Sequence, residues 1–210
     1  MTATPAHGFT LGLLLGAGRG RRFDPAAPGR KLDVAMTPEA GARRLGEAAY
    51  EALAAAVDAV VVATRTADTP LANHARESGA QLVVPEHAEL GMGHSLAAAA
   101  TLSMAYEADV MTLVVALADM PWVRTETIQL LIAESQRSDC IVQPVFADKP
   151  GHPVVFPARF AAELARCAGD VGARDVVQRH RDQLRQINVD DSGVLRDVDT
   201  PRDLLGTAPS

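Results

Sequence analysis

Three short stretches of the chain combine the charged and small residues that phosphate and metal chemistry requires. The first follows the apolar run 9–15 and reads Gly16-Ala17-Gly18-Arg19-Gly20-Arg21-Arg22-Phe23, with Lys31 shortly after it. Glycine lets main-chain N–H groups approach an anion closely, and the basic side chains add positive charge. In a chain whose formal net charge is −6, this cationic cluster predicts a polyphosphate ligand. The structural alternative is an ordinary turn with arginines on its surface.

The glycines of this stretch match neither of the common nucleotide-binding glycine motifs. In the dinucleotide pattern GxGxxG, Gly16 and Gly18 fit, but the last position holds Arg21. The Walker pattern requires lysine between glycine and Ser or Thr, whereas Lys31 is followed by Leu32. The sequence therefore predicts a phosphate-binding turn of a different kind.

The other two stretches place carboxylates where a strand or an extended segment ends. Asp119 follows the apolar run 110–117, and a carboxylate in that position is well placed to hold Mg²⁺. Near the C-terminus, Asp197 and Asp199 flank Val198, so both carboxylates share one face of an extended segment. Each assignment has a structural alternative, because Asp119 would also cap a turn and Asp199 the start of a helix.

Apolar runs rich in β-branched residues alternate along the chain with stretches of helical periodicity. The expected strands are 9–15, 59–64, 81–84, 110–117, 140–145, 151–156 and one near 184–189; the expected helices are 43–57, 68–78, 94–106, 125–137, 158–168 and 201–205. This alternation predicts an α/β three-layer sandwich with a mostly parallel central sheet. Ligands of such sheets lie outside the carboxyl ends of the strands, so we expect the glycine turn and Asp119 at one edge.

Composition narrows the possible classes of protein. The chain has 210 residues, 48% of them hydrophobic, which suits one domain over 1–210 with a loose N-terminal tail over 1–8. The acidic balance argues against nucleic-acid binding, and no apolar run reaches the about 20 residues of a membrane span. Without a secretory pattern or a CxxC pair, a cytoplasmic location with reduced Cys140 and Cys167 is expected.

In these motifs and in their order, the chain resembles the MobA-like nucleotidyltransferases nearly from end to end. The segment 15–23 with Lys31 is similar to the N-terminal signature of that family, and 117–121 is similar to its metal-binding strand end. Further blocks follow in the same order: Gly91-Met92-Gly93-His94-Ser95-Leu96, Gly151-His152-Pro153-Val154, Gly169-Asp170-Val171-Gly172-Ala173-Arg174 and Asp197-Val198-Asp199-Thr200-Pro201-Arg202-Asp203. The likeness is closest to the molybdenum cofactor cytidylyltransferase (MocA-like) branch.

The resemblance implies a Rossmann-like fold of the nucleotide-diphospho-sugar transferase type. It also implies Mg²⁺-dependent transfer of a nucleoside monophosphate from a nucleoside triphosphate to a phosphorylated acceptor, with release of pyrophosphate. In the MocA-like branch the donor is CTP and the acceptor is the molybdopterin cofactor. A molybdoenzyme or its chaperone is then an expected partner.

The roles implied for single residues follow from the same blocks. Arg22 and Lys31 would neutralise the triphosphate, and Asp119 and Asp199, with Asp197 as a possible substitute, would hold Mg²⁺. The remaining implied contacts are to the nucleotide, from Ala17, Gly18, Arg19, Gly91 and Ser95, and to the acceptor, from His152 and Gly172.

The first loop departs from the family pattern. Gly20 stands where serine is usual, and Asp24 stands where glycine is usual. The loop before Lys31 is lengthened by residues 25–29, and the apolar stretch usual after the lysine is replaced by residues 32–36. These departures motivate a different class of function, a non-catalytic protein that binds or hands over the molybdenum cofactor. A third possibility is a sugar-phosphate nucleotidyltransferase or a glycosyltransferase that uses nucleotide sugars.

Overall fold

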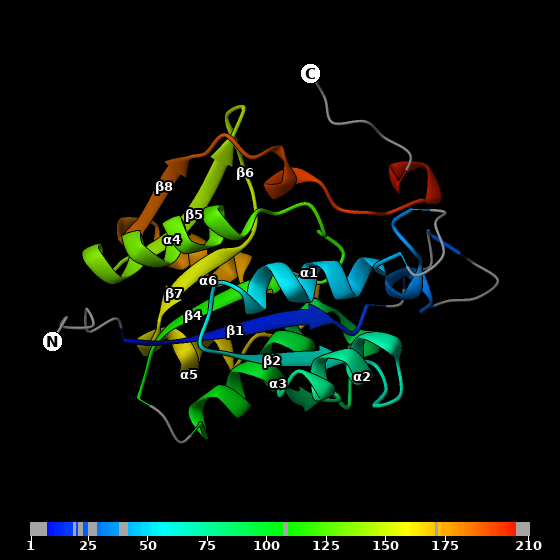
Figure 1. The fold of residues 1–210 in the computed structure, drawn as a ribbon. Coiled ribbons are helices and arrows are strands. Elements are labelled where there is room, and N and C mark those ends of the chain that lie inside the picture. The colour runs from blue at the N-terminus through cyan, green and yellow to red at the C-terminus, as the bar shows by residue number, and fades with distance from the viewer. Residues whose placement is uncertain are drawn as a thin grey trace, which may run out of the picture.

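The computed structural model describes residues 8–18, 20, 23–24, 29–37, 42–106, 109–170 and 172–204. Within them, eight strands form one sheet in the order β3-β2-β1-β4-β7-β5-β6, with β8 paired to β5 (Figure 1). The strands are β1 Phe9–Gly16, β2 Ala59–Thr64, β3 Gln81–Val83, β4 Val110–Leu117, β5 Ile141–Phe146, β6 Lys149–Pro150, β7 Val154–Pro157 and β8 Leu184–Asn188. Only β7 and β6 run against the others, so the sheet is mostly parallel, as predicted.

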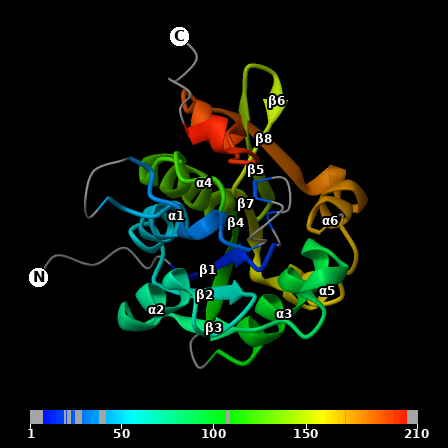
Figure 2. The ribbon, with the colours of Figure 1, turned by 90° about the vertical axis from the view of Figure 1, so that its right-hand side faces the viewer.

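Helices cover both faces of the sheet and complete a three-layer sandwich. They are α1 Leu45–Ala54, α2 Pro70–Glu77, α3 Met92–Met104, α4 Thr125–Ser138, α5 Ala161–Leu164 and α6 Arg174–Arg179. One core cluster joins α1, α2 and α4 to the sheet, and a second joins α3, α5 and α6 to its other face (Figure 2). None of the helices in the described part of the chain is long and apolar enough to cross a membrane.

The central position of β1 and β4 follows from their continuous apolar sequence. Alternate side chains of a strand point to opposite faces, so Leu14 enters one core cluster while Leu13 and Leu15 enter the other. At Gly12 a Cβ would come within 2.9 Å of the Leu53 side chain, so glycine lets α1 pack closely on β1. The carboxyl ends of β1 and β4 therefore lie side by side at one edge of the sheet, in parallel register.

Several predicted elements differ from the structure near the C-terminal half. The predicted helix 158–168 is a 3-10 turn followed by the four-residue helix α5, and 201–205 is the 3-10 turn Pro201–Leu204. The predicted strand 151–156 begins only at Val154; before it, the N–H of His152 donates to the carbonyl oxygen of Val194, outside the sheet, at 2.9 Å. The helix α6, Arg174–Arg179, was not among the expected helices. The tail expected over 1–8 lies outside the described residues except for Gly8.

Candidate functional site

A cleft of about 700 Å³ opens at the carboxyl ends of β1 and β4. Figure 2 faces this edge of the sheet, toward which β1 points in Figure 1. Six separate parts of the described chain meet there: the glycine turn, the 3-10 turn Lys31–Asp33, the segment 88–95 at the start of α3, the end of β4, Asp170 and Asp197. The described lining residues include Ala17, Gly18, Gly20, Lys31, Glu89, Gly91, Met92, Ser95, Asp119, Asp170 and Asp197.

The glycine turn follows directly from β1. Ala17 is buried, whereas a Cβ added at Gly18 would have no atom of the described residues within 4 Å, so these residues leave open space beside Gly18. Gly20 has a φ of +56°, and a Cβ there would lie 2.9 Å from Cβ of Lys31. Glycine at this position lets the turn close onto the lysine. The expected roles of Arg19 and Arg22 fall on residues outside the described part of the chain.

Lys31 reaches the end of β4 from a distant part of the sequence. Its Nζ donates a hydrogen bond to Oδ2 of Asp119 at 2.6 Å and lies 4.0 Å from Oδ1 of Asp199. The exposed fractions of the three side chains are 12%, 27% and 41%, so this ion pair lies at the floor of the cleft and is partly shielded from water. The structure therefore brings together three residues that the sequence analysis assigned to phosphate and metal chemistry.

The C-terminal carboxylates reach the site because their segment lies along the end of β4. The N–H of Val198 donates to the carbonyl oxygen of Asp119 at 2.9 Å, and the Val198 side chain is fully buried. The carboxylates on either side of it therefore point away from the core, as the alternation predicted. Burial raises the pKa of Asp197, and the carboxylates of Asp199 and Asp119 raise that pKa further, while Lys31 opposes the shift.

Capping of the 3-10 turn at Pro201 is carried out by Asp203. Its carboxylate accepts hydrogen bonds from the main-chain N–H groups of Asp199 and Thr200 and from the Thr200 hydroxyl. These hydrogen bonds, first of all that from the Thr200 N–H, lower the pKa of Asp203. The carboxylate four residues after Asp199 thus satisfies main-chain donors at the start of this turn.

The sequence analysis missed Asp191, a buried carboxylate that holds the C-terminal segment in place. Its Oδ2 accepts from the Thr127 hydroxyl at 2.7 Å and from the Arg124 N–H at 3.0 Å, and its Oδ1 accepts from the Gly193 N–H at 2.9 Å. These bonds tie the start of α4 to the 3-10 turn Ser192–Leu195. This turn leads into residues 197–199, the acidic segment that carries Asp197 and Asp199. The available signal was an aspartate two residues before a glycine, typical of an Asx turn.

The start of α3 forms the opposite wall of the cleft. Gly91 has a φ of +127°, and Cβ atoms at Gly91 and Gly93 would come within 2.3 and 2.6 Å of the main chain of loop 168–170. The N–H of Gly93 donates to the carbonyl oxygen of Gly169 at 2.8 Å. These glycines are therefore required by the contact between two loops, and Gly91 also lines the cleft. The buried Ser95 lines it from the first turn of α3.

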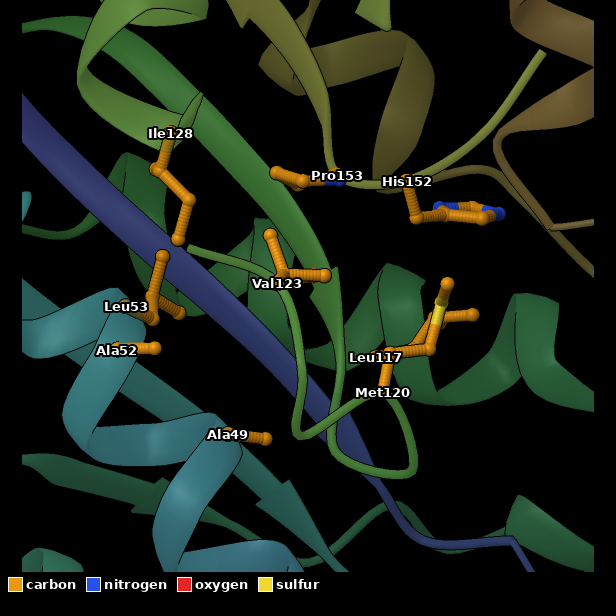
Figure 3. Close-up of a pocket in the computed structure, with 10 residues that line it drawn as sticks. Ala49, Ala52, Leu53, Leu117, Met120, Val123, Ile128, His152 and Pro153 are labelled. Atoms are coloured by element: carbon orange, nitrogen blue, oxygen red, sulfur yellow. The ribbon is translucent and has the colours of Figure 1, made fainter. Parts of the chain in front are cut away.

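The two residues expected to bind the acceptor lie apart from each other. Figure 3 shows the His152 ring beside Leu117 and Met120, at one end of a small apolar pocket under β4. Burial lowers the pKa of His152, the Asp119 carboxylate opposes this, and Nδ1 is buried without a hydrogen-bond partner among the described residues. Gly172 lines a separate depression beside α5 and α6 and is not brought into the cleft.

The donor set of the cleft suits a hard divalent cation. No group of three or more His, Cys, Asp or Glu side chains is arranged to hold a metal ion in the part of the chain that the structure describes. However, Asp119 and Asp199 both approach Lys31 Nζ and supply only carboxylate oxygens. Mg²⁺ is usually held by one or two carboxylates together with substrate phosphates, so these residues fit such an ion.

Comparison with known proteins places these features in context. The model of the MobA-like NTP transferase domain matches residues 12–184. Among solved structures, Rv0371c from Mycobacterium tuberculosis H37Rv has a TM-score of 0.74 and 25% identity over 94% of this chain and 96% of that chain. The structure of Rv0371c in complex with manganese has a TM-score of 0.69 and 25% identity, over 93% of this chain and 95% of that chain. A nucleotidyl transferase from Methanothermobacter has a TM-score of 0.69 and 20% identity, over 94% of each chain. The search of curated proteins found no match.

Proposed function

Because this chain belongs to the MobA-like NTP transferase family and is a nucleotidyltransferase, we propose that it transfers CMP from CTP to a phosphorylated molybdopterin-type cofactor and releases pyrophosphate. The observation that supports this proposal is the meeting of the glycine turn, Lys31 and Asp119 in one cleft. The proposal takes 1–210 as one domain that works in the cytoplasm and delivers its product to a molybdoenzyme or its chaperone.

The charges of the cleft favour a nucleotide that arrives with a divalent cation. The described lining residues carry four carboxylates, on Glu89, Asp119, Asp170 and Asp197, and one cation, Lys31. Because carboxylates outnumber cations among the described lining residues, a bound divalent cation would reduce their repulsion of a triphosphate. In the proposal Asp119 and Asp199, with Asp197 as a possible substitute, hold Mg²⁺, which would neutralise charge on the phosphates.

The residues of this chain would act by positioning and by charge. Main-chain N–H groups of the turn Ala17–Gly18–Arg19 would hold the nucleotide phosphates, and Gly91 and Ser95 would contact the base or the ribose. Lys31 and Arg22 would neutralise charge on the triphosphate. An oxygen of the acceptor phosphate then attacks the α-phosphorus in line, and the bond to the leaving pyrophosphate breaks. Such transfers need little covalent work from the protein, so orientation and electrostatics supply the rate.

The acceptor is proposed to enter from the side of His152. The ring of this histidine lies beside Leu117, the last residue of β4 (Figure 3). Gly172 borders the cleft only indirectly, because a Cβ added there would lie 3.7 Å from Met92, a lining residue. We therefore propose that His152 contacts the acceptor itself and that Gly172 shapes the opposite wall through Met92.

Pyrophosphate release with Mg²⁺ and each of CTP, GTP, ATP and UTP, in the presence of molybdopterin-type acceptors, tests the proposal. CTP is expected to give the fastest release. Asp119→Asn is expected to slow it by about 100-fold or more, since the carboxylate at the metal is lost. Asp109→Asn is the matched control, because Asp109 is exposed at the other end of β4 and should leave the rate unchanged.

Three outcomes would contradict the proposal. Equal rates for the Asp119 and Asp109 variants would remove Asp119 from the site. Binding of the molybdenum cofactor without binding of nucleoside triphosphate or release of pyrophosphate would favour a handover protein. Tighter binding of nucleotide sugars than of free nucleoside triphosphates, measured by thermal shift, would favour a glycosyltransferase.

A further inference from the structure

The ammonium group of Lys31 lies near both carboxylates that the proposed function assigns to the divalent cation. Its Nζ is 2.6 Å from Oδ2 of Asp119 and 4.0 Å from Oδ1 of Asp199. We infer that Lys31 is an internal counter-ion that competes with the metal for these carboxylates, so that metal binding requires Nζ to leave. This inference rests on the metal assignment of the proposed function.

The residues around Lys31 pack closely, which positions the base of its side chain. Leu32, the next residue, packs against Gly16 and Gly46 at the base of α1, where Cβ atoms would come within 3.2 Å of its side chain. On the other side Gly20 lies against the Lys31 Cβ. Gly20 thus packs against the aliphatic part of the lysine side chain, and Leu32 anchors the chain at the next residue. The ammonium group is positioned by the carboxylates.

The carboxylates need a counter-ion whether or not a metal is bound. The main-chain hydrogen bond from Val198 to Asp119 fixes the acidic segment against the end of β4, so Asp197 and Asp199 cannot move far from Asp119. Among the described residues that line the cleft, Lys31 is the one cation. The backbone therefore keeps the three carboxylates close to one another. In the absence of a metal, the charge of Lys31 offsets the repulsion between them.

This arrangement links binding of the metal to binding of the triphosphate. A metal ion that arrives alone must displace Nζ and leave the ammonium group without its carboxylate partner. A triphosphate in the same cleft offers Nζ new oxygen partners beside the glycine turn. We therefore expect the metal to bind weakly by itself and more tightly together with the nucleotide.

The test measures Mn²⁺ binding without nucleotide, by electron paramagnetic resonance of the free ion. Lys31→Met is expected to bind Mn²⁺ about tenfold or more tightly than the wild type, because the competing charge is gone. Lys149→Met is the matched control: Lys149 is the only other lysine, lies exposed on β6, and should leave the affinity unchanged. Unchanged, weaker or undetectable Mn²⁺ binding by Lys31→Met would overturn the inference.

A second measurement uses the wild-type chain and does not depend on the folding of a variant. With only two lysines, protein labelled with ¹³C at lysine Cε gives two resonances, which Lys149→Met assigns. Saturation with Mg²⁺ and a nucleoside triphosphate is expected to shift the Lys31 resonance and not that of Lys149. An unmoved Lys31 resonance would overturn the inference. Pyrophosphate assays are separate from both readouts, so failure of the proposed reaction would be distinguished from failure of the lysine competition.

Discussion

Replacement of Asp191 by alanine is expected to weaken both the fold and the acidic segment of the site. The Asp191 side chain is almost fully buried and accepts three hydrogen bonds, from Thr127, Arg124 and Gly193. Hydrogen bonds to a charged group contribute about 1.5–3 kcal/mol each, and removal of the acceptor leaves their donors unpaired. The cost of burying the carboxylate offsets part of this sum, so we expect a loss of about 3–5 kcal/mol.

Urea unfolding followed by circular dichroism measures this loss directly. Asp191→Asn keeps the shape and one acceptor oxygen and is expected to lose about 1–2 kcal/mol. Asp190→Ala is the matched control, because Asp190 is the exposed neighbour and should change the free energy of unfolding by less than about 0.5 kcal/mol. If Asp191→Ala is no less stable than Asp190→Ala, the buried network does not hold the segment.

Three further predictions test the walls of the cleft. Gly93→Ala is expected to lose about 1–3 kcal/mol of stability, because its Cβ would lie 2.6 Å from the main chain of Ala168. Gly18→Ala, whose Cβ would meet no atom within 4 Å in the described part of the chain, is expected to keep its stability and to bind nucleoside triphosphate more weakly by calorimetry; an unchanged affinity would remove Gly18 from the nucleotide site. Burial lowers the pKa of His152 below its ordinary value of 6.5, and the Asp119 carboxylate opposes this shift. As the pH falls, this histidine is therefore protonated in the unfolded chain before it is protonated in the folded chain, which favours unfolding. The wild type should therefore lose more stability than His152→Gln between about pH 7.5 and 5.5 in urea unfolding, and equal losses would contradict the burial argument.

Local patterns in the sequence were enough to predict the central strands and the ends at which chemistry was expected. The predicted strands 59–64 and 110–117 match β2 and β4 residue for residue, because continuous apolar sequence is typical of strands buried on both faces. Alternation predicted that Asp197 and Asp199 share one face and that Val198 takes the other, and the structure places Val198 in the core. Each of these predictions depends only on neighbouring residues.

Other features depend on which distant segments meet, and these the sequence did not reveal. The short helices α5 and α6 and the late start of β7 depend on tertiary contacts, such as that of Gly151 with Val194. For Asp191 the sequence offers only the local Asx-turn pattern with Gly193, because its other two partners lie 64 and 67 residues away along the chain.

The sequence by itself determined that β1 and β4 are central strands, that a glycine turn follows one and that a carboxylate follows the other. Tertiary structure alone decided that Lys31, 88 residues from Asp119 in the sequence, places its ammonium group on that carboxylate. The physical reason is that hydrophobic periodicity is a local property of the chain. A contact between charged groups depends instead on how the core, here Leu32 against Gly16, brings their backbones together.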